Sequence, residues 1–354
     1  MSLFKRITAA VLCVCMLAAT AACSGEDKTW AVKTEERTVP IGVYIYYQYL
    51  AYQNATAKVA DAAKPILEQK VEEQDATTWI KDQALDYTKM VLLMDQKMKE
   101  LNLSLTEEEQ KQITSSATTQ WSQYSTLLEG YGISKESFTI ATSEFGTKSQ
   151  KIFQALYGKE GSQAINDDEL KKFFEEKYSD FSLIMMPLYD TATYAPLDEA
   201  KTAEYKKLLS DYATQLNSGS TTFAAVEEAV KTKLNLPTAP SQNVTAILNT
   251  ESGYPEELIT LLSSMTNGEA KTMELPTANA ELLVVKHDVT AKTQTQLGGE
   301  ATRQEVLASM KQQEFIDNMT KEAKALTNVT VNQKALDSYQ PTKFVTKSET
   351  SSKS

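Results

Sequence analysis

The sequence predicts a mainly helical α+β protein, in which an N-terminal helical module is completed by a C-terminal helix and an α+β domain is inserted between them. From residue 39 to 174, apolar residues recur at three- and four-residue steps, as in amphipathic helices. Between residues 181 and 286, short apolar runs alternate with short helical segments, which indicates a small sheet with helices packed on it. A last long amphipathic segment covers residues 300–326. Its apolar face needs a partner, and we expect it to return to the N-terminal helices.

The composition favours a folded chain without a nucleic-acid partner. The chain has 354 residues, of which 42% are apolar, so it is long enough for two domains with real cores. It carries 36 Lys and Arg against 47 Asp and Glu, a formal charge of −11. Because no dense basic stripe stands out against this charge, we expect no binding to nucleic acid.

The scarcity of histidine and cysteine excludes most metal and nucleophile chemistry. A zinc site needs three or four His, Cys or carboxylate ligands, and His287 is the single histidine. His287 closes an apolar run without a nearby motif, so we interpret it as a polar strand end, with a catalytic base as the alternative. The glycines form neither a dinucleotide-binding nor a phosphate-binding loop. The sequence therefore predicts no catalytic residue, no metal and no cofactor.

Residues 1–22 have the pattern of a lipoprotein signal peptide. Lys5 and Arg6 precede an apolar stretch that is too short to span a membrane. The following residues 20–23 (TAAC) resemble the bacterial lipobox, in which the cysteine is lipidated, although Thr20 stands where Leu is usual. We therefore predict lipid attachment at Cys23. The alternative is an ordinary secretory signal that leaves Cys23 free, which is a liability in an oxidising compartment.

The predicted anchor places the protein on the extracytoplasmic side of the cell membrane. Two or more acyl chains hold a protein stably on a membrane, whereas a single chain does so only marginally. Residues 23–38 are polar, charged and without periodicity, as expected of a tether between membrane and globule.

The helical module is predicted over residues 39–178. Its helices are expected at residues 43–52, 80–101, 106–130, 134–157 and 166–174. Thr106 with Glu109 forms a capping box, and Asn166 and Ser134 are suitable N-caps. The acidic runs at residues 107–109 and 167–169 are interpreted as first-turn helix charges, with calcium ligands as the alternative.

The first helix carries tyrosines on both sides, which is more than one core face uses. They are Tyr44, Tyr46, Tyr47, Tyr49 and Tyr52. Two interpretations stay open: the rings line a cleft, or they pack between this helix and the returning C-terminal one.

The inserted domain is predicted over residues 179–292. Strands are expected at residues 181–188, 244–248, 270–275 and 282–286, and helices at 199–216, 222–231 and 255–263. Residues 293–340 contain the returning helix and a short strand at 329–331. Residues 341–354 have the composition of a disordered tail.

Three motifs in this order resemble the PrsA-type lipid-anchored foldases and the SurA-type periplasmic chaperones. The first is residues 166–178 (NDDELKKFFEEKY), similar to the family's entry helix. The second is residues 216–226 (LNSGSTTFAAV), similar to its Gly-x-x-Phe turn and following helix. The third is residues 265–269 (MTNGE) before the apolar run at 282–286, similar to its Leu-x-x-Gly-Glu turn and closing strand.

The resemblance implies a helical chaperone module, a parvulin-like prolyl isomerase domain and unfolded or partly folded secreted proteins as partners. The family's catalytic histidines are unmatched, because residues 181–186 contain no His and His287 lies beyond the expected position. The predicted function is therefore a membrane-anchored foldase or chaperone whose isomerase activity is doubtful. The alternatives are an active peptidyl-prolyl cis-trans isomerase and a surface lipoprotein that binds one ligand or partner.

Overall fold

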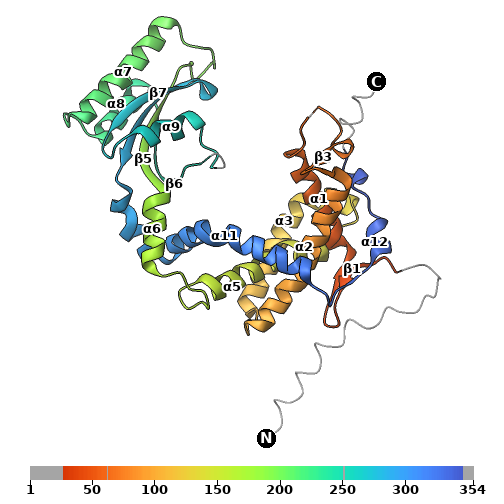
Figure 1. The fold of residues 1–354 in the computed structure, drawn as a ribbon. Coiled ribbons are helices and arrows are strands. Elements are labelled where there is room, and N and C mark those ends of the chain that lie inside the picture. The colour runs from red at the N-terminus through yellow and green to blue at the C-terminus, as the bar shows by residue number, and fades with distance from the viewer. Residues whose placement is uncertain (1–26, 62, 250–251, 346–354) are drawn as a thin grey trace, which may run out of the picture. The chain divides into compact units, whose positions relative to one another are not determined.

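The computed structural model describes residues 27–61, 63–249 and 252–345. These residues form two compact units, which are described separately (Figure 1). Unit 1 takes its described residues from Met1–Ile152 and Asp317–Ser354, and unit 2 from Phe153–Ile316. The predicted signal peptide at residues 1–22 and the predicted lipid attachment site Cys23 lie outside the described residues. The domain boundaries drawn from the sequence stay predictions.

Unit 1 is mainly helical. Its helices are α1 (Ile41–Thr56), α2 (Ala76–Glu100), α3 (Glu107–Gly130), α4 (Lys135–Thr139), the first part of α5 (Phe145–Tyr157), the last part of α11 (Glu300–Ala325) and α12 (Gln333–Asp337). A π-helical turn, η2 (Ile140–Glu144), joins α4 to α5, and 3-10 turns lie at η1 (Ile66–Glu68) and η5 (Pro341–Phe344). A short hairpin is formed by β3 (Lys70–Val71) and β4 (Gln74–Asp75).

Local signals in the sequence explain where these helices begin. The Thr106 hydroxyl accepts a hydrogen bond from the Glu109 N–H at 3.1 Å, and the Glu109 carboxylate accepts from the Thr106 N–H at 2.7 Å. This is the predicted capping box, and it satisfies two N–H groups that a helix start otherwise leaves unpaired. The predicted N-cap Ser134 likewise accepts from the Ser137 N–H at 3.1 Å. The predicted helix starts at residues 106 and 134 are thus confirmed, whereas α1 and α2 begin at Ile41 and Ala76, before the predicted residues 43 and 80.

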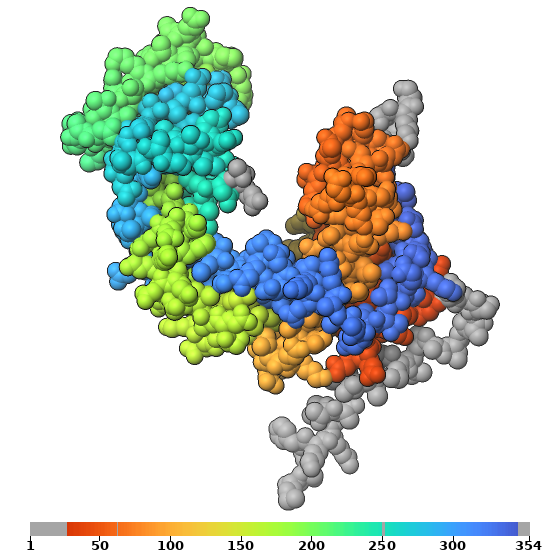
Figure 2. Space-filling model, viewed as in Figure 1, coloured from red at the N-terminus to blue at the C-terminus, as the bar shows by residue number. Residues whose placement is uncertain are grey.

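A three-stranded sheet joins the two ends of the described chain within unit 1. Its strands are β1 (Trp30–Lys33), β2 (Thr38–Pro40) and β9 (Thr330–Val331), in the order β2-β1-β9. In Figure 2 the blue C-terminal residues lie against the red first residues of this unit. Residues 23–38 were predicted as a tether, but Trp30–Lys33 and Thr38 belong to the strands β1 and β2 of the folded unit. Val32 and Val39 are fully buried, and their strand partners are distant in sequence or across a turn, so local composition gave no sign of them.

The prediction of a disordered tail over residues 341–354 is also wrong for residues 341–345. Pro341 and Phe344 are buried in η5. The Phe344 ring packs among tyrosines of α1 and the end of α3, which compensates for the polar composition of the segment. Residues 346–354 lie outside the described part of the chain.

Unit 2 is built around a four-stranded antiparallel sheet in the order β6-β5-β8-β7. Its strands are β5 (Tyr178–Pro187), β6 (Ser241–Ile247), β7 (Ala270–Leu275) and β8 (Ala280–His287). Its helices are the rest of α5 and α11, with α6 (Asp167–Lys177), α7 (Glu199–Asn217), α8 (Phe223–Lys233), α9 (Glu256–Ser264) and α10 (Thr293–Gly298), and its 3-10 turns are η3 (Pro276–Ala278) and η4 (Val289–Lys292). The mainly helical α+β fold class is confirmed.

Successive side chains of each strand point to opposite faces of this sheet, and each face packs into its own hydrophobic core. Ile184 and Leu283 pack with α7 and α8 on one face, whereas Phe181 and Val284 pack with α9 on the other (Figure 1). Because both of their faces are covered, the central strands β5 and β8 are largely apolar runs, as the sequence indicated. A polar side chain inside such an apolar run is therefore unusual and marks a position to inspect for a functional role.

Candidate functional site

An open aromatic cavity of about 450 Å³ lies on unit 1 between α1, α2 and the start of α5. We call it the aromatic groove. It is lined by Tyr47, Leu50, Ala51, Asn54, Lys58, Glu72, Trp79, Gln83, Tyr87, Ala141 and Phe145. The lining is mostly apolar and aromatic, with charged side chains at one end, which is the usual composition of a site for apolar groups.

Tyr47 organises the wall of the groove. Its ring centroid lies 5.5 Å from that of Tyr87 and 6.4 Å from that of Phe145. Its hydroxyl donates a hydrogen bond to the Ala141 carbonyl at 3.0 Å. Burial raises the pKa of Tyr47 above its usual range, so the phenol stays protonated and keeps this bond.

The far wall depends on the π-helical turn η2. The sequence predicts one continuous helix over residues 134–157, but five residues in the middle widen into a π turn. A π turn adds one residue to a helical turn and redirects the side chains that follow, and such turns are common at functional sites. Here it brings Ala141 and Phe145 to the groove.

A strained turn forms the charged end of the groove. Glu72 and Glu73 join β3 to β4 with φ values of 50° and 66°, in the left-handed region that favours Asn and Gly. Glu72 accepts a hydrogen bond from Trp79 Nε1 at 3.1 Å and pairs with Lys58. The Lys58 ammonium, and secondarily Trp79, hold the pKa of Glu72 below its usual range. A strained backbone conformation at this position is a reason to assign Glu72 a role in the groove.

Two apolar side chains of the groove reach the surface. Leu50 is 38% exposed and Tyr87 is 36% exposed, whereas Tyr47 and Trp79 are buried behind them. The groove therefore offers exposed apolar surface beside buried aromatic rings, a combination typical of surfaces that contact apolar groups.

The tyrosines of the first helix follow only in part the two interpretations that the sequence left open. Tyr47 lines the groove, and Tyr46 packs its ring edge-on against Phe138, 5.4 Å away. Tyr49 and Tyr52 instead pack against Phe344 of the C-terminal segment. Part of the set thus faces a cleft, whereas Tyr49 and Tyr52 meet the 3-10 turn η5 and not the returning helix that the second interpretation named.

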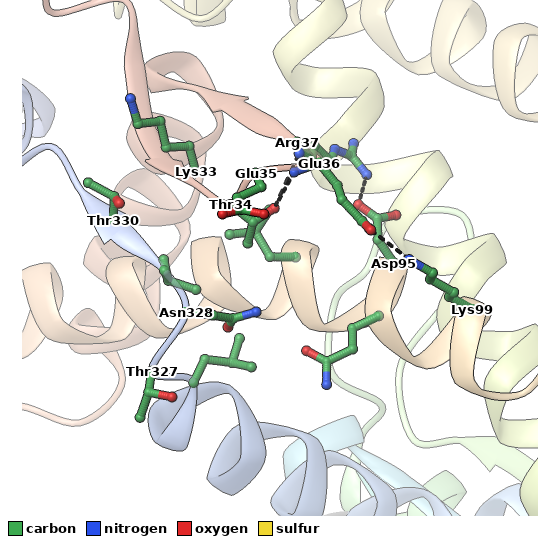
Figure 3. A pocket seen from close by; sticks show the side chains of 14 residues that line it. Lys33, Thr34, Glu35, Glu36, Arg37, Asp95, Lys99, Thr327, Asn328 and Thr330 are labelled. Atoms are coloured by element: carbon green, nitrogen blue, oxygen red, sulfur yellow. Dashed lines mark hydrogen bonds and ion pairs between the residues drawn. The ribbon is translucent and has the colours of Figure 1, made fainter.

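Unit 1 also contains a polar cavity of about 920 Å³ between the β1–β2 turn, α2 and residues 326–330. Arg37 and Lys99 point toward Asp95 and Glu36, with which they form ion pairs (Figure 3). Arg37 also binds Glu144 at 3.0 Å. These five charged side chains neutralise one another, so their pairing stabilises the contact of the β1–β2 turn with α2 and η2 and does not leave them free for a charged ligand.

A cluster of polar side chains interrupts the apolar sheet of unit 2. We call Asp180, Ser182, Asn243, Thr245 and His287 the sheet cluster. Ser182 is buried; its hydroxyl lies 2.7 Å from His287 Nε2 and donates to Asn243 Oδ1 at 2.5 Å. Asp180 is also buried and accepts from the Thr245 hydroxyl at 2.6 Å.

The hydrogen bonds of Ser182 limit the chemistry of the sheet cluster. The single proton of the Ser182 hydroxyl is directed to Asn243 Oδ1, and the donor in its contact with His287 Nε2 depends on the histidine tautomer. A hydroxyl whose proton is directed to an amide oxygen is not the activated serine of a nucleophilic relay.

The sequence identified the position of His287 but not its partners. His287 lies half-buried at the end of β8, as predicted of a polar strand end. Its contacts depend on the pairing of β5 with both β6 and β8, and the only local signal was polar Asp180 and Ser182 alternating in an apolar strand.

The acidic runs occupy the first turns of α3 and α6, as predicted. Among the described residues, no group of three or more His, Cys, Asp or Glu is arranged to hold a metal ion. In the same part of the chain, no helix combines the length and apolarity needed to cross a membrane.

No protein-family model and no curated protein matches the chain. Several solved structures are similar to it at low identity. Foldase protein PrsA from Lactococcus lactis is 15% identical, with 90% of this chain and 99% of that chain covered and a TM-score of 0.37. Foldase protein PrsA from Streptococcus pneumoniae is 15% identical, with 78% and 97% covered and a TM-score of 0.36. PrsA from Bacillus subtilis is 13% identical, with 76% and 93% covered and a TM-score of 0.30.

Proposed function

We propose that this chain is an extracytoplasmic chaperone of the foldase type, which binds unfolded secreted polypeptides through the aromatic groove. The observation that carries the proposal is the exposure of Leu50 and Tyr87 beside the packed rings of the aromatic groove. The resemblance of the three sequence motifs to the lipid-anchored foldases supports the same function.

The groove is suited to weak and reversible binding. Burying one Leu or Phe side chain contributes about 1.5–3 kcal/mol, whereas a micromolar complex requires about 8 kcal/mol. One or two client side chains in the groove therefore give an affinity that permits release. Such binding selects for apolar content and not for a particular sequence, as a chaperone requires.

Matched surface variants test the proposal. Leu50→Asp with Tyr87→Ser removes the exposed apolar surface of the groove. Leu127→Asp with Tyr124→Ser makes the same changes on α3, where the two side chains are 43% and 52% exposed. We expect the groove variant to lose most of its ability to suppress aggregation of reduced insulin and heat-unfolded citrate synthase, measured by light scattering, and the α3 variant to retain it.

Equal activity of the two variants would contradict the assignment to the groove. Saturable binding to one small ligand, with no protection of unrelated unfolded proteins, would instead favour a ligand-binding surface lipoprotein.

Prolyl isomerisation is a second candidate, favoured by the sheet cluster. Rotation about a peptide bond has a barrier of about 18–20 kcal/mol, which falls when hydrogen bonds weaken the amide resonance. Exposed Asn243 lies on the edge strand β6, where its Nδ2 is placed to donate such a hydrogen bond while its Oδ1 is held by Ser182, which also contacts His287.

A proline-peptide assay decides this candidate. If the mature chain catalyses isomerisation, we expect Ser182→Ala and His287→Ala each to reduce kcat/KM at least tenfold, while Ser218→Ala, at an exposed helix end, changes nothing. Absence of turnover in the parent chain, or turnover that both variants retain, would remove the sheet cluster as an isomerase site.

We further propose that Cys23 carries the lipid that holds the chaperone on the outer face of the cell membrane. The support is the small-residue motif before Cys23 in the sequence. Metabolic labelling with a fatty-acid analogue should modify the parent protein and not a Cys23→Ser variant, which we expect in the soluble fraction.

A further inference from the structure

The last described residues of unit 1 lie across an aromatic face that is separate from the aromatic groove. We call residues 339–345 the C-terminal strap. The face beneath it is formed by Tyr49 and Tyr52 of α1 and by Tyr131 at the end of α3.

The strap binds this face mainly through one ring. The Phe344 centroid lies 4.9 Å from that of Tyr131 in an edge-on arrangement, 5.6 Å from that of Tyr49 and 5.9 Å from that of Tyr52. Phe344 is 2% exposed, so the three tyrosines form a closed socket for an aromatic side chain.

The polar contacts beneath the strap are incomplete. Gln48 is fully buried, and its Nε2 donates to the Tyr339 carbonyl at 3.1 Å and to the Tyr44 hydroxyl at 3.3 Å. Its Oε1 has no hydrogen-bond partner among the described residues. A buried acceptor without a donor is unfavourable, so the strap leaves one polar group of this face unsatisfied.

The strap has the form of a bound peptide. Its regular structure is the four-residue 3-10 turn η5, which is closed by a bond from the Lys343 N–H to the Gln340 carbonyl at 3.2 Å. It enters the socket with a proline and, three residues later, a phenylalanine. Short 3-10 turns are weakly stable by themselves, so the socket and not the turn holds the segment in place.

We propose that this face is a second polypeptide-binding site, which the chain's own strap occupies and from which an unfolded client segment carrying proline and an aromatic residue displaces it. This inference rests on the proposed chaperone function. A tethered segment competes at an effective concentration in the millimolar range, so only clients that fill the socket better, or that also donate to Gln48 Oε1, replace the strap. The strap thus sets the minimum affinity that a client segment needs to bind this face.

A peptide with the sequence of residues 338–345 (SYQPTKFV) tests the displacement. Its binding is measured by fluorescence anisotropy to the parent chain, to Phe344→Ser, and to a chain ending at residue 337. We expect both variants to bind the peptide at least tenfold more tightly than the parent does. Phe344→Ser keeps the rest of the strap and therefore reports on the socket even if the shortened chain does not fold.

Two controls separate this inference from the proposed function. A peptide with serine in place of its phenylalanine should not bind, and the added variant Tyr131→Ser should abolish binding of the original peptide. The groove variant Leu50→Asp with Tyr87→Ser should leave peptide binding to the Phe344→Ser chain unchanged. Absence of peptide binding to folded Phe344→Ser, or equal binding to the parent, would overturn the displaceable strap whatever the activity of the aromatic groove.

Discussion

Single residues of unit 1 adopt conformations that local preference disfavours. The turn between β3 and β4 places Glu72 and Glu73 in the left-handed region, where a residue other than Gly is about 1 kcal/mol or more less stable. Glu72 has a role there, because it holds Trp79 and Lys58 at the groove. The side chain of Glu73 is exposed and carries only the strain.

Glu73→Gly should therefore stabilise the protein. Glycine adopts positive φ without a steric cost, and after allowing for its greater freedom in the unfolded chain we expect a gain of roughly 0.5–1 kcal/mol in the free energy of unfolding. Urea denaturation measures the change. Gln120→Gly, on the exposed side of α3, should instead lose about 1 kcal/mol, and a loss at both positions would show that the turn is not strained.

A second residue-scale effect concerns Glu281 in β8, which is 6% exposed. Burial raises the pKa of Glu281; nearby Lys206 lowers it in part and Glu274 raises it further. The folded state thus binds a proton more readily than the unfolded state, and the stability that protonation gives is lost as pH rises from the unfolded toward the folded pKa.

Glu281→Gln should accordingly be more stable than the parent at pH 7. The difference should shrink as the pH falls and vanish below about 4, where the parent carboxyl is protonated in both states. Urea denaturation at pH 4, 5.5 and 7 measures it, with the exposed Glu257→Gln as the matched control. A constant difference across this range would contradict the assignment.

The sequence predicted some elements of secondary structure more closely than others. The starts of α3, α4 and α6 follow from caps within four residues, so local sequence located them. The π turn η2 was missed because widening a helix by one residue leaves its apolar pattern almost intact. Elements marked by a local cap or an apolar run, including the four strands of the unit 2 sheet, were predictable, whereas the short strands β1 and β2 and the turn η5 were not.

The end of α7 illustrates a contact that joins two elements. Asn217 Nδ2 donates to the Ala270 carbonyl at 2.8 Å, and the Ala270 N–H donates to Asn217 Oδ1 at 2.7 Å. The side chain thus fixes the helix end to the first residue of the edge strand β7. It also gives a structural reason for an asparagine in the Leu-Asn-Ser-Gly motif of the sequence.

Asn217→Ala should destabilise unit 2 by about 2 kcal/mol, because it leaves the N–H and carbonyl of buried Ala270 unpaired. Hydrogen exchange of β7 peptides, together with urea denaturation, measures the loss. The neighbouring Ser218→Ala removes only exposed bonds and should change stability by less than about 0.5 kcal/mol. Similar losses at both positions would show that the bidentate contact is not important.

At the scale of the whole molecule, the two ends of the described chain meet in unit 1. Val32 pairs with Val331 across β1 and β9, so strands 299 positions apart stabilise each other. This explains why the tether prediction failed at β1: a short strand gains order from a partner that composition does not reveal, just as Phe344 of the predicted tail does from tyrosines of α1 and α3. The same limit applies to the site, since the sequence marked the tyrosines of α1 but not which of them meet α2 and which meet Phe344.

Asn332 connects the C-terminal segment to the first strand. Its Nδ2 donates to the carbonyls of Asp27 at 2.8 Å and Trp30 at 3.1 Å, while its Oδ1 accepts from the Ala335 N–H at 3.2 Å and caps α12. Loss of a cap costs about 1 kcal/mol, and loss of the bonds to the first strand adds to it.

We therefore expect Asn332→Ala to lower the stability of unit 1 by about 1–2 kcal/mol and to accelerate hydrogen exchange in β1 as well as near residue 332. The neighbouring Gln333→Ala removes one exposed contact to Asp337 and should leave β1 unaffected. Faster exchange confined to residues near 332 would mean that the first strand holds its place without the C-terminal segment. If unit 1 is one cooperative body built from both ends of the described chain, hydrogen-exchange protection should fall both in β1 and near residue 332.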